Sequence, residues 1–447
     1  MSIFDGARLT NEVFKLDVER MRRGWYSDKY FVNISRMLAA LSAEGYVFAG
    51  EHGRPLPSGS PASIFTGDLR VEMQWFTRRQ GTTIVVGIDK ALAMLRHAAG
   101  TWMGERFAET WDDLEVWAVH DGAVVHGEGD PAHVTPVLRV RGRYRDFALL
   151  ETPTLGVLTR GSRVATNVFD TLVAAAGKPV LFFPARFDLH ESQAADGYAY
   201  NIAVQRFNLD HAQRLGAFIS TDAQGDWWGG SGGGTVAHAA IACFLGDTAE
   251  AMAAFAATLP PEIPRIALVD YNNNSVKDSR LTVERMFRLY RQRLEAGDEA
   301  DAQRYVLYGV RLDTSNALRD VNVPPLGEPD LDLGVTPRLV FTVRQALDHT
   351  WEGWDLPEEW RARAVDYCRA VKIVVSGGFT AERIRRFEQL HVPADIYAVG
   401  SALFANAGPS VTDFTADVVR VEVGGEWIPL AKVGRQAGEN PDLERVR

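Results

Sequence analysis

The second half of the chain alternates short apolar segments with longer amphipathic ones. From about residue 166 onward, seven apolar runs follow one another in the order PVLFFPA, GAFIST, GTVAHA, RIALVDY, VLYGVRLD, KIVVSGG and DIYAVGS. Helices are expected between them, because one helical face carries Val283, Met286, Phe287, Tyr290 and Leu294 and because Thr336-Pro337 suits a helix start. Strands that alternate with helices in this way predict a parallel (β/α) barrel.

The first third of the chain has a different pattern. Helical segments, such as 34–41 and 89–98, are mixed with alternating runs such as LRVEMQWF, TIVVGI and PVLRVRGRY, and the segment VVRVEVGGEWIPLAKVGRQAG near the C-terminus alternates again. We therefore predict an α/β fold: an incomplete parallel (β/α) barrel with an α+β N-terminal layer domain to which the C-terminal segment returns. The predicted boundaries are 1–150 for the layer domain, 151–410 for the barrel and 411–447 for the returning segment.

Composition and charge narrow the functional classes. The 447 residues are 46% hydrophobic, which suffices for one large core or two moderate ones, and the formal net charge is -10, which argues against a nucleic-acid-binding surface. The two cysteines, Cys243 and Cys368, lie far apart and indicate neither a disulfide framework nor a zinc cluster. No signal peptide and no run of about 18 apolar residues is present. We expect a cytoplasmic protein with no nucleic-acid or membrane partner.

The stretch VKIVVSGGFTAERI, residues 371–384, joins a strand to a helix through Ser376, Gly377 and Gly378. Such a junction directs free backbone N–H groups and the positive end of the helix dipole at one point, which suits phosphate. Two glycines can also serve tight geometry alone. The next predicted strand, however, ends in Gly400-Ser401, and in (β/α) barrels the loops after the last two strands commonly form one shared phosphate site.

Polar residues follow the other predicted strands as well. Because catalytic groups of parallel barrels lie at the C-terminal strand ends, these residues are candidates for one site. They offer a cation for an anionic group, carboxylates for ribose hydroxyls or Mg²⁺, and an imidazole, which together suit a sugar phosphate. The candidates are Arg186, Thr235, His238, Asp270, Asn272, Asp313, Thr314, Ser315 and Asn316.

Three of these candidates have structural alternatives. Arg186 could form an ordinary ion pair with a neighbouring helix. Asp313 could cap a following helix, since Asp-Thr-Ser is good capping material. His238 could be a buried histidine, because its neighbours are apolar.

The ordered set of motifs resembles the nicotinate phosphoribosyltransferases, type II phosphoribosyltransferases related to the quinolinate and nicotinamide enzymes. The resemblance runs over nearly the whole chain. Its motifs are SDKY, LLETPTLGVLTRGSRVAT, GGGTVAHA, LVDYNNN, YGVRLDTSN, VVSGGFT and YAVGSALF. The resemblance implies that the protein makes nicotinate mononucleotide and pyrophosphate from nicotinate and phosphoribosyl pyrophosphate, and that this reaction is coupled to ATP hydrolysis. It also implies that Mg²⁺ binds the pyrophosphate and that the protein is a homodimer.

The resemblance also assigns residues. It implies that Tyr30 and Thr235 contact the pyridine acid, that Arg186 assists with its carboxylate, and that His238 is phosphorylated by ATP. Asp313 would hold the ribose hydroxyls as a catalytic residue, and Ser376, Gly377, Gly378, Gly400 and Ser401 would bind the 5-phosphate. The predicted substrate-binding set further contains Arg160, Asp270, Arg311 and Ser315, and no residue is assigned as a metal ligand.

The sequence departs from the family pattern at three points. Arg186-Phe187 stands where many members have paired arginines, DYNNN and DTSN replace commoner motifs, and the C-terminal region has no cysteine for the metal site of some relatives. Quinolinate or nicotinamide therefore stays open as the base. A sugar-phosphate lyase or isomerase is a less favoured alternative, because it would need a lysine at a strand end and only Lys277 lies near one. A non-catalytic nucleotide sensor is also less favoured, because it should have lost His238 and Asp313, and both are present.

Overall fold

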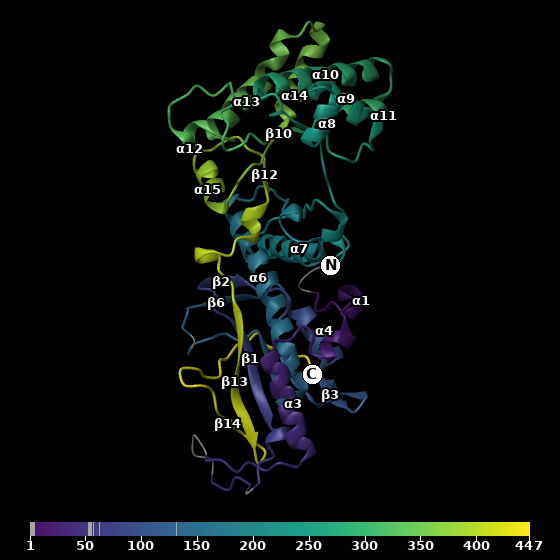
Figure 1. The fold of residues 1–447 in the computed structure, drawn as a ribbon. Coiled ribbons are helices and arrows are strands. Elements are labelled where there is room, and N and C mark those ends of the chain that lie inside the picture. Colours follow the sequence, from purple (N-terminus) through teal and green to yellow (C-terminus); the bar gives the residue numbers. More distant parts are fainter. Residues whose placement is uncertain (1–4, 52–55, 57, 62, 131) are drawn as a thin grey trace.

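The computed structural model describes residues 5–51, 56, 58–61, 63–130 and 132–447. The molecule is elongated (Figure 1). The first and last segments of the chain form a β layer at one end, and helices α8 to α14 gather at the other. The long helix α6, Glu151–Ala174, runs between the two parts and packs on α4, β2 and β13 as well as on α7 and α15.

The β layer is a six-stranded sheet in the order β14-β13-β1-β7-β5-β15. Its strands are β1 Arg70–Thr77, β5 Glu115–Ala118, β7 Leu138–Arg143, β13 Phe414–Val423, β14 Glu426–Pro429 and β15 Glu444–Arg445. β13 pairs antiparallel with β1 from Val71 to Thr77. The predicted return of the C-terminal segment to the N-terminal layer is therefore confirmed.

Both faces of β1 are covered. Val71, Met73 and Trp75 point to one face and join a hydrophobic core with α4, Ile88–Ala98, as their alternation predicts. On the other face Gln74 donates to the Gln436 carbonyl and accepts from the Gly438 N–H. The C-terminal segment thus lies across the sheet as well as within it.

The second sheet has five strands, all parallel, in the order β8-β12-β11-β10-β9. They are β8 Val180–Phe182, β9 Ile266–Leu268, β10 Gly309–Leu312, β11 Lys372–Val375 and β12 Ile396–Val399. Ile219 adds one parallel bridge to Phe182 at the β8 edge, so the order continues as in a barrel and breaks between Ile219 and β9. This arrangement of strands agrees with the predicted fold class, an incomplete parallel barrel.

Two of the seven predicted strands differ in the structure. The run GAFIST makes only the bridge at Ile219, and GTVAHA contains no strand and leads into helix α8, His238–Cys243. The glycines before α8 have no side chains to pack against a neighbouring strand, and the alanines favour a helix. The apolar character of this segment was therefore misleading.

Side chains of the parallel sheet alternate between two environments. Phe182, Ile373 and Val375 face the covering helices, while Leu181 and Val374 belong to a small inner cluster. The covering helices are α7 Gln193–Asp210, α9 Thr248–Thr258, α10 Ser275–Glu295, α13 Pro337–His349, α14 Glu358–Ala370 and α15 Ala381–Gln389. The Thr336 hydroxyl accepts from the Leu339 N–H at 3.2 Å, which confirms the predicted cap of α13.

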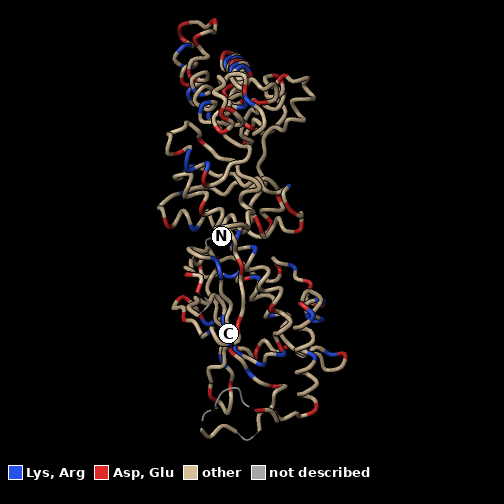
Figure 2. Tube along the Cα trace, turned by 60° about the vertical axis from the view of Figure 1, so that its left-hand side comes forward, with Lys and Arg blue, Asp and Glu red and all other residues tan. Residues whose placement is uncertain are grey.

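The remaining elements are short or peripheral, apart from α3, which carries the SDKY motif at its start. They are α1 Asn11–Phe14, α2 Val18–Arg22, α3 Lys29–Ala43, α5 Tyr144–Phe147, α11 Glu299–Ala302, α12 Pro329–Asp332, β2 Gly81–Ile84, β3 Gly100–Met103, β4 Arg106–Glu109 and β6 Val124–Gly127. Within the described residues, no helix combines the length and the apolar character needed to cross a membrane. Figure 2 shows acidic and basic residues interspersed along both halves of the chain.

Candidate active site

A cavity of about 610 Å³ lies where the parallel strands end. Its wall is formed by the residues that directly follow β8, β10, β11 and β12 and by the glycine-rich segment before α8. Among the residues predicted from the sequence, the lining includes Arg186, Thr235, His238, Arg311, Asp313, Ser376, Gly377, Gly378, Gly400 and Ser401. Strand ends that are far apart in sequence are thus brought together at one rim.

The turn after β11 has the geometry that an anion socket requires. The Ser376 N–H continues the sheet by donating to the Leu312 carbonyl, and Gly377 and Gly378 then adopt left-handed backbone conformations, with φ of 89° and 71°. The hydroxyl of Thr380 caps α15 directly afterwards. In the part of the chain that the structure describes, the N–H groups of Gly377 and Gly378 donate to no protein atom. These donors are available to a ligand.

The second glycine turn follows β12, which pairs with β11. A side chain at Gly400 would place its Cβ 2.6 Å from Cε2 of Phe187, which also lines the cavity. A larger residue here would have to displace the Phe187 ring. Gly400 and Ser401 complete the rim beside the first glycine turn.

Asp313 belongs to a small charged network. Its Oδ2 lies 3.0 Å from Nη2 of Arg311, and its Oδ1 accepts from the Ser376 hydroxyl at 2.7 Å. Arg311 Nε donates to the same hydroxyl at 2.9 Å. No helix begins after Asp313 in residues 313–320, so the interpretation as a helix cap is wrong. The network fixes the carboxylate at the cavity wall and offsets its charge.

His238 opens α8 and faces Asp270. Its Nε2 lies 3.1 Å from both carboxylate oxygens of Asp270. The His238 side chain is 46% exposed, so the interpretation as a buried histidine is wrong. Burial raises the pKa of Asp270 above its ordinary value, the charge of Asp313 adds to this, and His238 opposes it. One ring nitrogen is therefore held by a carboxylate and the other is left for a reacting group.

Arg186 follows β8 and carries a cation without an acidic partner. Its guanidinium lies over the ring of Phe187, 5.3 Å from the ring centre. Among the described residues no carboxylate is within ion-pair distance of it, so the ordinary ion pair considered from the sequence is absent there. The guanidinium is available to an anionic group of a ligand.

Of the residues that the resemblance assigned, four lie outside the lining of the cavity, as do the further strand-end candidates Asn272, Thr314 and Asn316. Asp270 does not line the cavity, but it contacts His238, which does. The Ser315 hydroxyl accepts from the Ala317 N–H. Arg160 is held by Asp188 and Asp196, each at 2.7 Å, which speaks against direct substrate contact.

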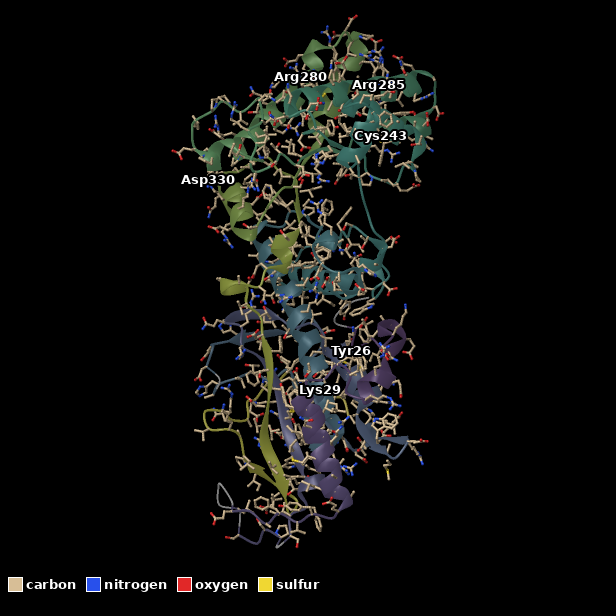
Figure 3. All side chains as sticks on the ribbon, in the orientation of Figure 1. Tyr26, Lys29, Cys243, Arg280, Arg285 and Asp330 are labelled. Atoms are coloured by element: carbon tan, nitrogen blue, oxygen red, sulfur yellow. The ribbon has the colours of Figure 1, made fainter. Side chains whose placement is uncertain are left out.

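Tyr30 is the fourth residue outside the lining and the most distant part of the predicted set. Its side chain is 58% exposed, and it stands in the β-layer end of the molecule next to Lys29. Figure 3 shows Lys29 far from Cys243, which ends the helix that His238 begins. Within one chain, Tyr30 does not reach the cavity.

Arg383 is a component that sequence reasoning missed. Its guanidinium donates to the carbonyls of Gly377, at 3.0 Å, and Val335, at 2.8 Å, and so ties the glycine turn to a separate loop. Burial lowers the pKa of Arg383 from its usual value. An arginine one turn into the helix that follows Gly377-Gly378 was the available signal, but its carbonyl partners come from the fold.

Three similarities to known proteins concern different shares of the chain. Residues 61–162 match the family model of the quinolinate phosphoribosyl transferase N-terminal domain. A stretch of 136 residues, 30% of this chain, is 33% identical to nicotinate phosphoribosyltransferase 1 of Arabidopsis thaliana and covers 21% of that protein. The match therefore spans about a fifth of the curated relative's length.

The third similarity is structural and covers nearly the whole molecule. Over 95% of its length the chain shares the fold of nicotinate-nucleotide pyrophosphorylase from Pyrococcus furiosus, with a TM-score of 0.61, 23% sequence identity and 81% of that chain covered. The overall fold of the chain is thus one that already occurs in a solved structure.

Proposed function

We propose that the chain is a type II phosphoribosyltransferase, in the group that includes the nicotinate phosphoribosyltransferases, and that it makes nicotinate mononucleotide for NAD biosynthesis. The co-substrate is phosphoribosyl pyrophosphate. The observation that carries this proposal is the pair of adjacent glycine turns beside the Asp313 network in one cavity. A phosphate and a ribose need these two features next to each other.

The proposed transfer requires positioning more than covalent chemistry. The pyridine nitrogen of nicotinate attacks C1 of the ribose, the bond from C1 to pyrophosphate breaks, and pyrophosphate leaves. The free N–H groups of Gly377 and Gly378 hold the 5-phosphate, and Asp313 accepts hydrogen bonds from the ribose hydroxyls. Because Arg311 and Ser376 fix the carboxylate, it is oriented before substrate binds and can stabilise the positive charge that develops near C1.

Mg²⁺ enters this proposal with the pyrophosphate. Within the described residues no group of three or more His, Cys, Asp or Glu could hold a metal ion by itself. Asp270 and Asp313 supply carboxylates in and beside the cavity, and these fit contacts to a cation that keeps most of its water and phosphate ligands. Bound Mg²⁺ would offset the charge of the departing pyrophosphate.

ATP coupling is proposed to act through His238. The contact with Asp270 orients one ring nitrogen, and the exposed side chain leaves the other nitrogen accessible. Attack of this nitrogen on the γ-phosphorus of ATP would break the bond to ADP and form phosphohistidine, whose hydrolysis drives nucleotide synthesis forward.

Nicotinate is preferred over quinolinate because of the residues at the end of β8. Arg186 offers one unpaired guanidinium to one carboxylate, and Phe187 occupies the place of a second arginine. Quinolinate has two carboxylates and would leave one poorly matched, while nicotinamide has none to bind Arg186. The base is therefore a monocarboxylate.

A homodimer is proposed to complete the site. Tyr30 cannot reach the cavity of its own chain, and Trp25, Tyr26 and Tyr30 are exposed together in the β-layer end. A second copy that places this layer over the barrel mouth would bring Tyr30 to the base and exclude water from the reactive centre. A monomer in light scattering that is fully active at nanomolar concentration would exclude this arrangement.

The direct test compares three bases. The purified protein is incubated with phosphoribosyl pyrophosphate and Mg²⁺, and nicotinate, nicotinamide and quinolinate are offered separately with and without ATP. We expect nicotinate mononucleotide with pyrophosphate, formed faster with ATP. A mononucleotide made only from quinolinate, with release of CO₂, would support the second candidate instead.

A further inference from the structure

A second cavity, of about 880 Å³, is lined by Arg383, whose guanidinium donates to the Gly377 carbonyl of the glycine turn. It is formed between α12 and α15, and its polar lining includes Asn316, Asp330, Glu382, Arg383, Arg385 and Arg386. It shares no lining residue with the first cavity. Figure 3 labels Asp330 in the half of the molecule that holds the covering helices. This volume lies in the range of small-molecule sites, which is roughly 300 to 1,000 Å³.

The three arginines of this second cavity have no carboxylate partner among the described residues. The Arg383 guanidinium donates only to carbonyls and to Asn316, and neither Arg385 nor Arg386 takes part in an ion pair or a side-chain hydrogen bond there. By contrast, Arg338 on the neighbouring helix is paired with Asp332 at 2.8 Å. Arg385 and Arg386 are exposed, and the charge of Arg385 opposes the rise that burial causes in the pKa of Asp170, but no carboxylate in the described part of the chain pairs with any of the three guanidinium groups, so a bound anion can reach them.

We propose that this cavity is a second anion site and that it binds a polyphosphate chain. Guanidinium groups match phosphate oxygens with paired hydrogen bonds, and Thr380, the N-cap of α15, lies in the same wall. Asp330 and Glu382 also line the cavity, so the three arginines and two carboxylates give the lining a net charge of +1. A chain of several phosphates reaches more than one arginine, which a single small anion does not.

The site is distinct from the proposed phosphoribosyl site, although one residue touches both. Arg383 lines the second cavity and also donates to the Gly377 carbonyl of the glycine turn. Arg385 and Arg386 have no such contact, and the charge of Arg385 acts against the rise that burial causes in the pKa of Asp170. Substitution of these two arginines therefore tests the second site and leaves the glycine turn intact.

The experiment measures binding of inorganic tripolyphosphate and of ATP by calorimetry at low salt, with excess ribose 5-phosphate present. The double variant Arg385→Ala/Arg386→Ala is compared with the wild type and with Arg214→Ala/Arg369→Ala, which removes the same charge from two exposed positions elsewhere. Circular dichroism verifies the fold of each variant. We expect the cavity variant to lose at least about tenfold in tripolyphosphate affinity, as the loss of one charged hydrogen bond implies, while the control retains it.

The outcomes distinguish a nucleotide ligand from an inorganic polyphosphate, and they distinguish failure of this proposal from failure of the proposed function. ATP binding that is tighter than tripolyphosphate binding, and equally sensitive to the cavity variant, identifies a nucleotide; equal affinities identify an inorganic polyphosphate. Unchanged binding in the cavity variant, or an equal loss in the control, overturns the proposal. Mononucleotide formation is assayed in parallel, so a protein that binds tripolyphosphate here but transfers no phosphoribosyl group refutes the proposed function alone.

Discussion

Replacing Gly378 by alanine separates the shape of the glycine turn from its role in anion binding. Gly378 has φ of 71°, where an L-residue is strained by about 1 to 2 kcal/mol. The new Cβ would also lie 2.6 Å from Nδ2 of Asn316, which must move and disturb the contact between Asn316 and Arg383. Gly297→Ala is the matched control, because Gly297 has φ of 79° and no atom near its Cβ position.

Strain at positive φ should lower the free energy of unfolding of each variant by about 1 to 2 kcal/mol, measured by urea denaturation. Gly378→Ala should lose more than the control because Asn316 must also move, and it alone should lose ligand affinity. Alanine keeps the backbone N–H, but the shift that its Cβ forces on the turn should misalign this donor; loss of one charge-assisted hydrogen bond costs about 1.5 to 3 kcal/mol, so ribose 5-phosphate affinity in calorimetry should fall roughly 10- to 150-fold in Gly378→Ala alone. Unchanged affinity in a folded Gly378→Ala protein would refute the assignment of the phosphate to this turn.

Three further predictions concern the β layer and the histidine. Glu72 is fully buried and contacts Arg141 and Arg420, each at 2.6 Å. Glu72→Gln should therefore lower the free energy of unfolding by about 3 kcal/mol, while the same change at the exposed Glu426 should alter it little. Similar losses in the two variants would contradict the role of the buried network. Burial raises the pKa of Asp121 to about 7. Between about pH 4 and pH 7 the folded state therefore keeps a proton that the unfolded chain has lost. The contribution of Asp121 to the free energy of unfolding should fall as the pH rises through this range. Asp121→Asn should flatten denaturation midpoints across that window, and an unaltered pH profile would count against the shift. His238→Ala should abolish ATP stimulation and acid-labile labelling by γ-labelled ATP while the fold survives; equal labelling of both proteins would remove His238 from the mechanism.

The position of the candidate site was predictable from the sequence because strand ends carry a strong local signal. β11 and β12 are short apolar runs that end in glycine, and the fold pairs them side by side. The rule that parallel strands present their C-terminal ends on one rim then places Asp313 and Arg186 beside the turns. Periodicity also sufficed for α10 and for the cap of α13.

Other features depended on contacts that no local pattern encodes. GTVAHA looks like a strand because it is apolar, but its last two residues, His238 and Ala239, begin helix α8. Arg160 had the character of a ligand-binding residue, yet Asp188 and Asp196, brought close by α7 and the loop before it, already neutralise its charge. Arg383 acts through carbonyl groups of the turn, which only the folded backbone assembles.

The most direct test of the account is the rate of nicotinate mononucleotide formation by Asp313→Asn. This change keeps the size of the side chain but removes the charge that Arg311 and Ser376 hold in place. We predict a fall in kcat/KM equivalent to about 1.5 to 3 kcal/mol, or roughly 10- to 150-fold, whereas Asp355→Asn, outside the cavity lining, should retain the wild-type value. Wild-type kcat/KM in a folded Asp313→Asn protein would contradict the claim that phosphoribosyl transfer takes place in this cavity.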